Sequence, residues 1–274
     1  MNYLCESSFS VARCAVLAMA SCYGSISAPL DGSAQGLSYL PIRSKLPDGT
    51  PVEIDVFGES EHAAGHRLLN GVIEEGLSWP FEETMGMDAF RAYFLSHAAF
   101  VVRVEPTAPA PAPSAEAPPA AAVPTGTGGG ETPSTGGATV TTVMAAATEE
   151  DERVDVWGAF YIKPNFPGRC SHVCNGGFIT DPRRRRRGVA RLMGYAFLRF
   201  AEDLGYKASY FNLVFRSNEA SLRLWRGLGF TELAVVSKAG RLKGIEGLVD
   251  AIQFHYDLES LREEDLPEDL RRST

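Results

Sequence analysis

Residues 172–205 read HVCNGGFITDPRRRRRGVARLMGYAFLRFAEDLG, and their pattern is that of a strand, a turn and a helix. The short, mostly apolar segment 172–180 predicts the strand, and the arginine-rich segment 181–188 predicts the turn. From Val189 to Leu204 the apolar residues recur at helical spacing, and Gly205 stands where a helix-ending glycine belongs. The apolar stripe of this helix consists of Leu192, Met193, Ala196, Phe197, Phe200 and Leu204.

Glycines and arginines give this unit its chemistry. Gly176 and Gly177 interrupt the strand, which indicates a bulge or the close approach of another group. The turn leaves backbone N–H groups and the positive end of the helix dipole free to bind a pyrophosphate. Arg183 to Arg187 add guanidinium groups that pair well with phosphate oxygens. The same run is also typical of a solvated basic loop, or of a nuclear-import or nucleic-acid patch.

Further strands and helices are predicted on both sides of this unit. Ala208–Phe215 is a near-continuous apolar run, typical of a central strand buried on both faces, with Asn212 as its one conspicuous amide. Ser217 or Asn218 can cap a helix that runs to about Leu228. The remaining patterns predict strands at 51–57, 99–104, 154–163, 231–237 and 249–256, and helices at 61–75 and 87–97.

One long segment interrupts this pattern. Residues 106–150 are rich in Pro, Ala, Thr and Gly and hold no aromatic residue, so we expect them to be disordered. Because closing a loop costs only about 0.6 kcal/mol per doubling of its length, one domain can carry such an insertion. We therefore predict a single domain made of 37–105 and 151–260, after a poorly ordered extension (1–36) and before a tail (261–274). Two independent domains would require 37–104 to fold alone.

Composition narrows the class of protein. The chain has 274 residues, of which 45% are hydrophobic, and its net charge is −8, which excludes wholesale disorder and argues against a dedicated nucleic-acid binder. No run approaches the roughly 18 to 20 apolar residues of a membrane span, so we expect no membrane partner. The five cysteines do not read as a disulfide framework. We expect a cytoplasmic protein, which also enters the nucleus if the arginine run serves import.

Metal binding is not predicted. His62 and His66 are spaced to share one face of a helix, but no third ligand is placed by spacing. Cys170, His172 and Cys174 likewise lack a fourth ligand at any usual spacing. Structural or solvated roles explain both groups better.

Two sequence blocks point to a family. Arg185, Gly188 and Ala190 fit the pattern Arg/Gln-x-x-Gly-x-Gly/Ala, and NEASLRLWRGLGF (218–230) is similar to Asn-x-x-Ala-x-x-Leu-Tyr-x-x-x-Gly-Phe. Together they resemble the GCN5-related N-acetyltransferase (GNAT) superfamily. Within it, the chain looks most like fungal N-acetyltransferases that detoxify L-azetidine-2-carboxylate and related proline analogues. The shared sequence segments are GAFYIKPNFPGRCSHVCNGGF (158–178), LGYK (204–207), FNLVF (211–215), AGRL (239–242) and VDAI (249–252).

The resemblance implies a fold and a cofactor. The fold is α/β, with a mixed, mostly antiparallel central sheet flanked by helices and two central strands that splay apart. Acetyl-CoA is the implied co-substrate, and its pantetheine enters the gap between those strands. A homodimer is also implied. The implied acetyl-CoA-binding residues are Phe178, Ile179, Arg185, Arg186, Arg187, Gly188, Val189, Ala190, Asn218 and Trp225.

The resemblance also implies an acceptor site and a catalytic pair. Asn175 and Asn212, one on each central strand, would hold a small imino acid, with Phe178 against its ring. Many members protonate the departing thiolate with a tyrosine, but Trp225 stands at that position, and indole is no acid near neutral pH. We therefore expect Asn218 to stabilise the thiolate, alone or besides capping a helix, and Asn175 to assist. The candidates for the general base that deprotonates the acceptor are water and His172.

The predicted function is transfer of acetyl from acetyl-CoA to the ring nitrogen of a proline-like imino acid by direct attack. Two alternatives stay open. The chain could be a protein, histone or other small-amine acetyltransferase, for which the arginine run would serve nuclear entry or docking. It could also be a regulatory module that binds CoA without turnover.

Overall fold

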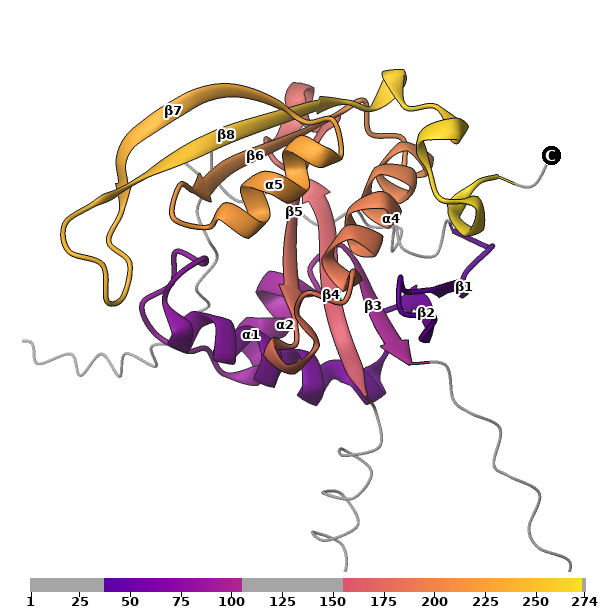
Figure 1. The fold of residues 1–274 in the computed structure, drawn as a ribbon, viewed down its shortest axis with the longest axis horizontal. Helices are drawn as coiled ribbons and strands as arrows, with labels where there is room; N and C mark the ends of the chain where they lie inside the picture. Colours follow the sequence, from indigo (N-terminus) through magenta and orange to yellow (C-terminus); the bar gives the residue numbers. More distant parts are fainter. Residues whose placement is uncertain (1–36, 105–154, 273–274) are drawn as a thin grey trace, which may run out of the picture.

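A single eight-stranded sheet organises the computed structural model, which describes residues 37–104 and 155–272 (Figure 1). The strand order is β1-β2-β3-β4-β5-β6-β8-β7. Neighbouring strands are antiparallel except β5 and β6, which pair in parallel. The strands are β1 (Ile42–Lys45), β2 (Pro51–Val56), β3 (Ala98–Val104), β4 (Val156–Pro164), β5 (Val173–Thr180), β6 (Ala208–Phe215), β7 (Thr231–Gly240) and β8 (Val249–Asp257).

Helices cover both faces of this sheet. The first face is covered by α1 (His62–Glu75) and α2 (Met87–Phe94), which bury Leu69, Phe90 and Phe94 against it. The second face is covered by α4 (Val189–Asp203) and α5 (Glu219–Gly227). We call these the α1/α2 face and the α4 face. Short 3-10 turns lie at Glu59–Glu61, Gly168–Cys170, Pro182–Arg184, Leu258–Ser260, Glu263–Asp265 and Glu268–Leu270.

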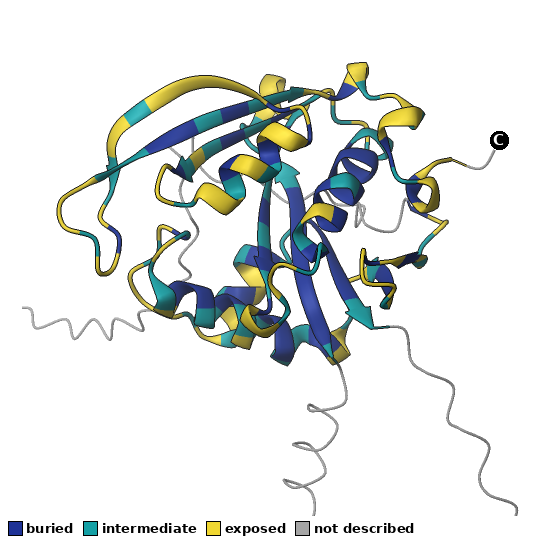
Figure 2. Cartoon of the chain, in the orientation of Figure 1, coloured by how far each residue is buried: buried dark blue, intermediate teal, exposed yellow. Residues whose placement is uncertain are grey.

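The alternation of side chains along the central strands explains the two cores. In β4, Phe160 and Ile162 belong to the core under α4, whereas Ala159 and Tyr161 belong to the core under α1 and α2. Because both faces are covered, the first seven residues of β4 are buried. The edge strand β7 is mostly exposed, as the burial colours show (Figure 2).

The predicted architecture, a mixed and mostly antiparallel sheet flanked by helices, is confirmed. Strands β3 and β4 pair directly, although the segment 105–154 separates them in the chain. The predicted extension 1–36 and insertion 106–150 lie outside the described residues. Among the helices of 37–104 and 155–272, none has the length and apolar character needed to cross a bilayer.

Local predictions differ from the structure in a few places. Strand β1 was not predicted, and α2 ends at Phe94 rather than at residue 97. Strand β6 is not buried on both faces, because it separates from β5 and leaves Leu213 42% exposed. The tail from Glu259, for which the sequence predicts either a short helix or a solvated segment, forms short 3-10 turns, and its Leu266 and Leu270 are buried in the core that contains α4.

Candidate functional site

Strands β5 and β6 separate after a short paired stretch. Their parallel pairing joins only Val173 to Ala208 and Cys174 to Ser209. Strand β5 then continues along β4 as far as Thr180, while β6 follows β8. Beyond Cys174 the edge of β5 that faces β6 therefore has no strand partner within the described part of the chain. The predicted splay is confirmed, and it leaves backbone hydrogen-bonding groups available to a ligand.

A cavity of about 350 Å³ lies at this opening. Both splayed strands contribute to its wall, together with α5 and the loop after α1. Because side chains of a strand alternate between faces, the cavity has one wall on each face of the sheet. Its lining residues include Trp79, Tyr93, Tyr161, Asn175, Gly177 and Asn212 toward α1 and α2, and Phe178, Phe211, Asn218, Ser221 and Trp225 toward α4 and α5.

The wall toward α4 and α5 is aromatic. Ring centroids lie 4.8 Å apart for Phe178 and Trp225, and 4.7 Å apart for Phe211 and Trp225. Asn218 caps α5, because its side chain accepts a hydrogen bond of 3.2 Å from the Ser221 N–H. The capping role predicted for Asn218 is therefore present. Its amide NH₂ is not used by this cap, so it remains free to donate into the cavity.

Gly176 and Gly177 pair regularly with β4, so the predicted bulge is not present there. The glycines instead allow close approach of side chains from both faces. A Cβ on Gly177 would lie 2.4 Å from the Tyr161 ring, and a Cβ on Gly176 would lie 2.6 Å from the Phe197 ring. The space that a side chain would fill is thus used by aromatic rings, of which Tyr161 belongs to the cavity wall.

Three asparagines connect the splayed strands on the α1/α2 face. Asn165, in the loop after β4, donates to Asn212 Oδ1 at 3.2 Å and accepts from Asn212 Nδ2 at 2.6 Å. Asn175 Nδ2 donates to the same Asn165 Oδ1 at 3.0 Å. Asn175 and Asn212 are therefore brought together, as predicted, but through Asn165. Sequence reasoning missed Asn165, although it lies inside the quoted segment 158–178.

Sequence reasoning also missed Lys163, which lies two residues before Asn165. Its Nζ lies 4.2 Å from the Tyr93 ring centroid and 4.3 Å from the Tyr161 ring centroid. Both rings line the cavity, and their hydroxyl groups hydrogen-bond to each other at 3.0 Å. Burial lowers the pKa of Lys163 to about 8. A lone lysine at the end of a strand gives no local signal, because its environment comes from α2 and β4.

The start of α4 presents the predicted anion-binding geometry. Gly188 precedes the helix with φ of 95°, a conformation that favours glycine, and no side chain caps the first turn. The backbone N–H groups of Val189 and Ala190 therefore point outward without an intrahelical acceptor.

The neighbouring arginines are engaged by carboxylates. Arg185 contacts Glu75 at 2.7 Å, and Arg187 pairs with Asp48. Arg183 pairs with Asp181 and Arg184 with Asp155. Arg186 is exposed. Arg185 and Arg187 face carboxylates of other segments, so a bound phosphate would compete with Glu75 and Asp48 for them.

Comparison with known proteins agrees with this geometry. Residues 139–230 match the Acetyltransferase (GNAT) family. Over 118 residues the chain is 50% identical to N-acetyltransferase aca1 of Schizosaccharomyces pombe. The part of the chain within residues 139–230 is therefore similar to GNAT acetyltransferases. The aca1 match covers 43% of this chain and 56% of that relative, so it spans little more than half of the relative's length.

Solved structures share the fold of the described residues. A GCN5-related N-acetyltransferase from Kribbella flavida covers 75% of this chain and 97% of its own, with a TM-score of 0.55 and 16% identity. YncA from Salmonella typhimurium, solved with its cofactor acetyl-CoA, covers 77% of this chain and 95% of its own, with a TM-score of 0.54 and 14% identity. At such identities the likeness concerns the fold.

The residues predicted for the site fall into two groups in the structure. One group lines the cavity: Asn175, Phe178, Asn212, Asn218 and Trp225. The second lies along the turn before α4 and its first residues: Arg185, Arg186, Arg187, Gly188, Val189 and Ala190. Ile179 belongs to neither group, because its side chain is buried in the core under α1 and α2. His172 is exposed at the start of β5 and is not a lining residue, so the cavity offers no support for it as base.

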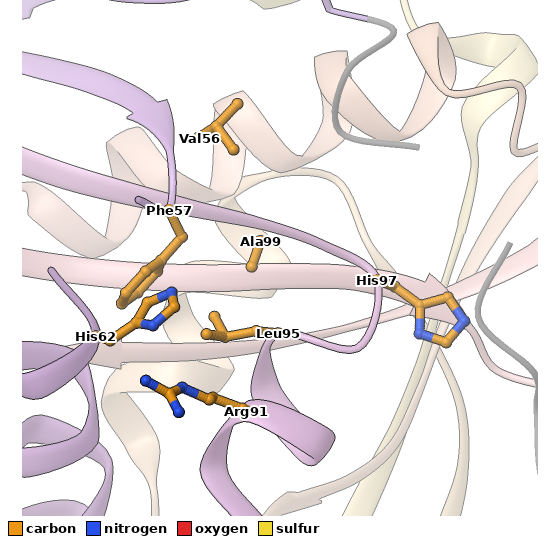
Figure 3. A pocket seen from close by; sticks show the side chains of 7 residues that line it. All are labelled: Val56, Phe57, His62, Arg91, Leu95, His97 and Ala99. Atoms are coloured by element: carbon orange, nitrogen blue, oxygen red, sulfur yellow. The ribbon is translucent and has the colours of Figure 1, made fainter. Parts of the chain in front are cut away.

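A second cavity lies beside α1, α2 and β3. Figure 3 shows Phe57, His62, Leu95 and Arg91 around it, with His97 apart from them. Burial lowers the pKa of His62. His66 instead contacts the Met85 carbonyl at 2.6 Å, so the two histidines do not face a common ion. In the described ranges no group of three or more His, Cys, Asp or Glu is placed to hold a metal.

Proposed function

We propose that this chain is an acetyl-CoA-dependent N-acetyltransferase whose acceptor is a small, proline-like imino acid. The observation that supports this proposal is the cavity that opens between β5 and β6 and has a different wall on each face of the sheet. A bisubstrate reaction needs such an arrangement, because the two reacting groups must approach from opposite directions.

The α4 face fits acetyl-CoA. The unpaired edge of β5 offers backbone groups to a pantetheine arm, and the uncapped start of α4 offers N–H groups to a pyrophosphate. When bound, acetyl-CoA supplies an activated acyl group as a thioester. Backbone N–H groups of β5 near Gly177 would polarise its carbonyl, and one such donor is typically worth about 3 kcal/mol. Arg185 and Arg187 would add charge beside the pyrophosphate.

The α1/α2 face fits a small polar acceptor. Asn175 and Asn212 present amides to the cavity, and aromatic rings enclose the remaining surface. In the reaction the acceptor nitrogen, deprotonated by water or another base, forms a bond to the acetyl carbon, and the C–S bond breaks. The NH₂ group of Asn218 would donate a hydrogen bond to the leaving thiolate. The Trp225 ring would pack beside the thioester and would not exchange a proton with it.

Release of free thiol from acetyl-CoA tests this proposal. The full chain is incubated with acetyl-CoA and azetidine-2-carboxylate, with simple amines, or with lysine-containing peptides. We expect turnover that depends on the imino acid. Turnover only with peptides or simple amines would mean that the acceptor is a peptide or a simple amine and not an imino acid. Binding of acetyl-CoA without turnover would support the regulatory alternative.

We also infer a homodimer. The edge strand β7 exposes Leu233 and Val235 at 53% and 50%, which is compatible with a contact between copies. Light scattering of the full chain measures the mass directly, and a monomer at micromolar concentration would contradict the inference.

A further inference from the structure

Lys163 is not one of the residues that line the cavity, but it lies at the rim, over two of the rings that do. It is the eighth residue of β4 and pairs in register with Asn175 of β5, so both side chains lie on the α1/α2 face. Its ammonium group lies over two tyrosine rings that belong to the cavity wall. The same rim therefore carries a cation beside the asparagine amides.

Within the described part of the chain, this cation has no anionic partner. Across residues 37–104 and 155–272, no carboxylate forms an ion pair with Lys163. The other described cations that are not exposed do have one: Arg199 pairs with Asp203, Arg103 with Glu53, Asp55 and Glu61, Arg184 with Asp155, and Arg187 with Asp48. Removing an ammonium group from water is unfavourable unless it is paired, and tyrosine faces offset only part of this.

We propose that Lys163 determines acceptor specificity by pairing its ammonium group with the carboxylate of the acceptor bound in the cavity between β5 and β6. This rests on the proposed acceptor position on the α1/α2 face. The lowered pKa of Lys163 agrees with a cation that lacks its counter-charge when the cavity is empty. With the carboxylate held by Lys163, the amides of Asn175 and Asn212 are left to orient the ring.

Equilibrium binding tests this without requiring turnover. The full chain, saturated with free CoA, is titrated by calorimetry with azetidine-2-carboxylate and with azetidine-2-carboxamide. We expect wild type to bind the carboxylate at least tenfold more tightly, which corresponds to about 1.4 kcal/mol. In Lys163→Met the preference should fall below about twofold while carboxamide affinity changes little, and Lys163→Arg should retain part of the preference. Lys45→Met, at an exposed lysine of β1, is the matched control.

Three results would overturn the proposal: binding of neither probe, a wild-type preference that survives in Lys163→Met, or an equal loss of affinity for both probes. If Lys163→Met does not fold, the Lys163 side-chain resonances of wild type provide the test. Its pKa should rise by one unit or more with the carboxylate and stay unchanged with the carboxamide. Loss of preference without any thiol release would support the Lys163 assignment and refute the proposed acetyl transfer.

Discussion

Asn165 and Asn212 exchange two side-chain hydrogen bonds, of 3.2 and 2.6 Å, across the opening between β5 and β6. The pair joins the loop after β4 to a strand 47 residues later in the chain. Because Asn175 bonds to the same Asn165 oxygen, the amides of the proposed acceptor site form one connected group. The position of each amide therefore depends on Asn165.

Asn165→Ala should disturb both proposed acceptor-binding amides at once. We expect KM for the imino acid to rise about tenfold, KM for acetyl-CoA to change little, and the free energy of unfolding to fall by about 1 to 2 kcal/mol. Steady-state kinetics and urea unfolding measure these effects. Ser44→Ala, which removes a hydrogen bond to Asp269 away from the cavity, should change stability only. An unchanged KM for the acceptor would contradict the dependence on Asn165.

Asn218 allows capping to be separated from chemistry. Aspartate caps a helix about as well as asparagine but lacks the NH₂ donor, so Asn218→Asp should keep stability and lower kcat about tenfold or more. Asn218→Ala should lower kcat similarly and also cost about 1 kcal/mol of stability. Thermal unfolding and thiol release distinguish the two. Full activity in Asn218→Asp would mean that Asn218 is only a cap.

Arg185 is expected to exchange Glu75 for a phosphate when acetyl-CoA binds. Arg185→Ala should raise KM for acetyl-CoA about three- to tenfold at low salt. The difference in KM between variant and wild type should shrink in about 0.5 M salt, because salt screens charge contacts. Glu75→Gln, which removes the competing carboxylate, should not raise KM. Arg223→Ala, at an exposed ion pair on α5, is the control. A salt-independent effect of Arg185→Ala would count against a phosphate contact.

Gly177 and Gly71 should respond oppositely to alanine. A Cβ on Gly177 would overlap the rings of Tyr161 and Trp79, so we expect Gly177→Ala to lose about 1 to 3 kcal/mol of stability and to impair acceptor binding. Gly71 lies within α1, and its Cβ would meet nothing within 4 Å. Gly71→Ala should therefore stabilise the protein by about 0.5 to 1 kcal/mol. Calorimetric melting of both variants checks the signs.

Lys163 should make stability depend on pH in a defined window. Its folded pKa is about 8, against an ordinary value of 10.5, so below pH 8 both states carry the proton and the burial penalty is complete. Between these values the folded state is neutral while the unfolded state stays charged, so stability rises with pH. The advantage of Lys163→Met over wild type should shrink by about 1.4 kcal/mol from pH 7 to pH 9. Urea unfolding without ligand measures it, and a pH-independent difference would refute the assignment.

Periodicity and turn residues were sufficient to predict α1, α4, α5 and most strands, because these depend on neighbours a few residues apart. The motif around Gly188 and the helix after Asn218 likewise predict an acetyl-CoA site at the end of β5. Of the two alternatives predicted for Gly176–Gly177, the bulge is absent and the close approach of other groups is present, since those glycines make room for aromatic rings.

The partners of the polar side chains depended on tertiary structure. Arg185 meets Glu75 across 110 residues, and Lys163 lies over Tyr93, which comes from α2. Local patterns carry no information about such pairs, because strand order and splay bring them together only after folding. The chain's own pattern therefore specified which elements form and where acetyl-CoA is expected to bind. The packing of those elements specified which side chains face the cavity and which are already paired.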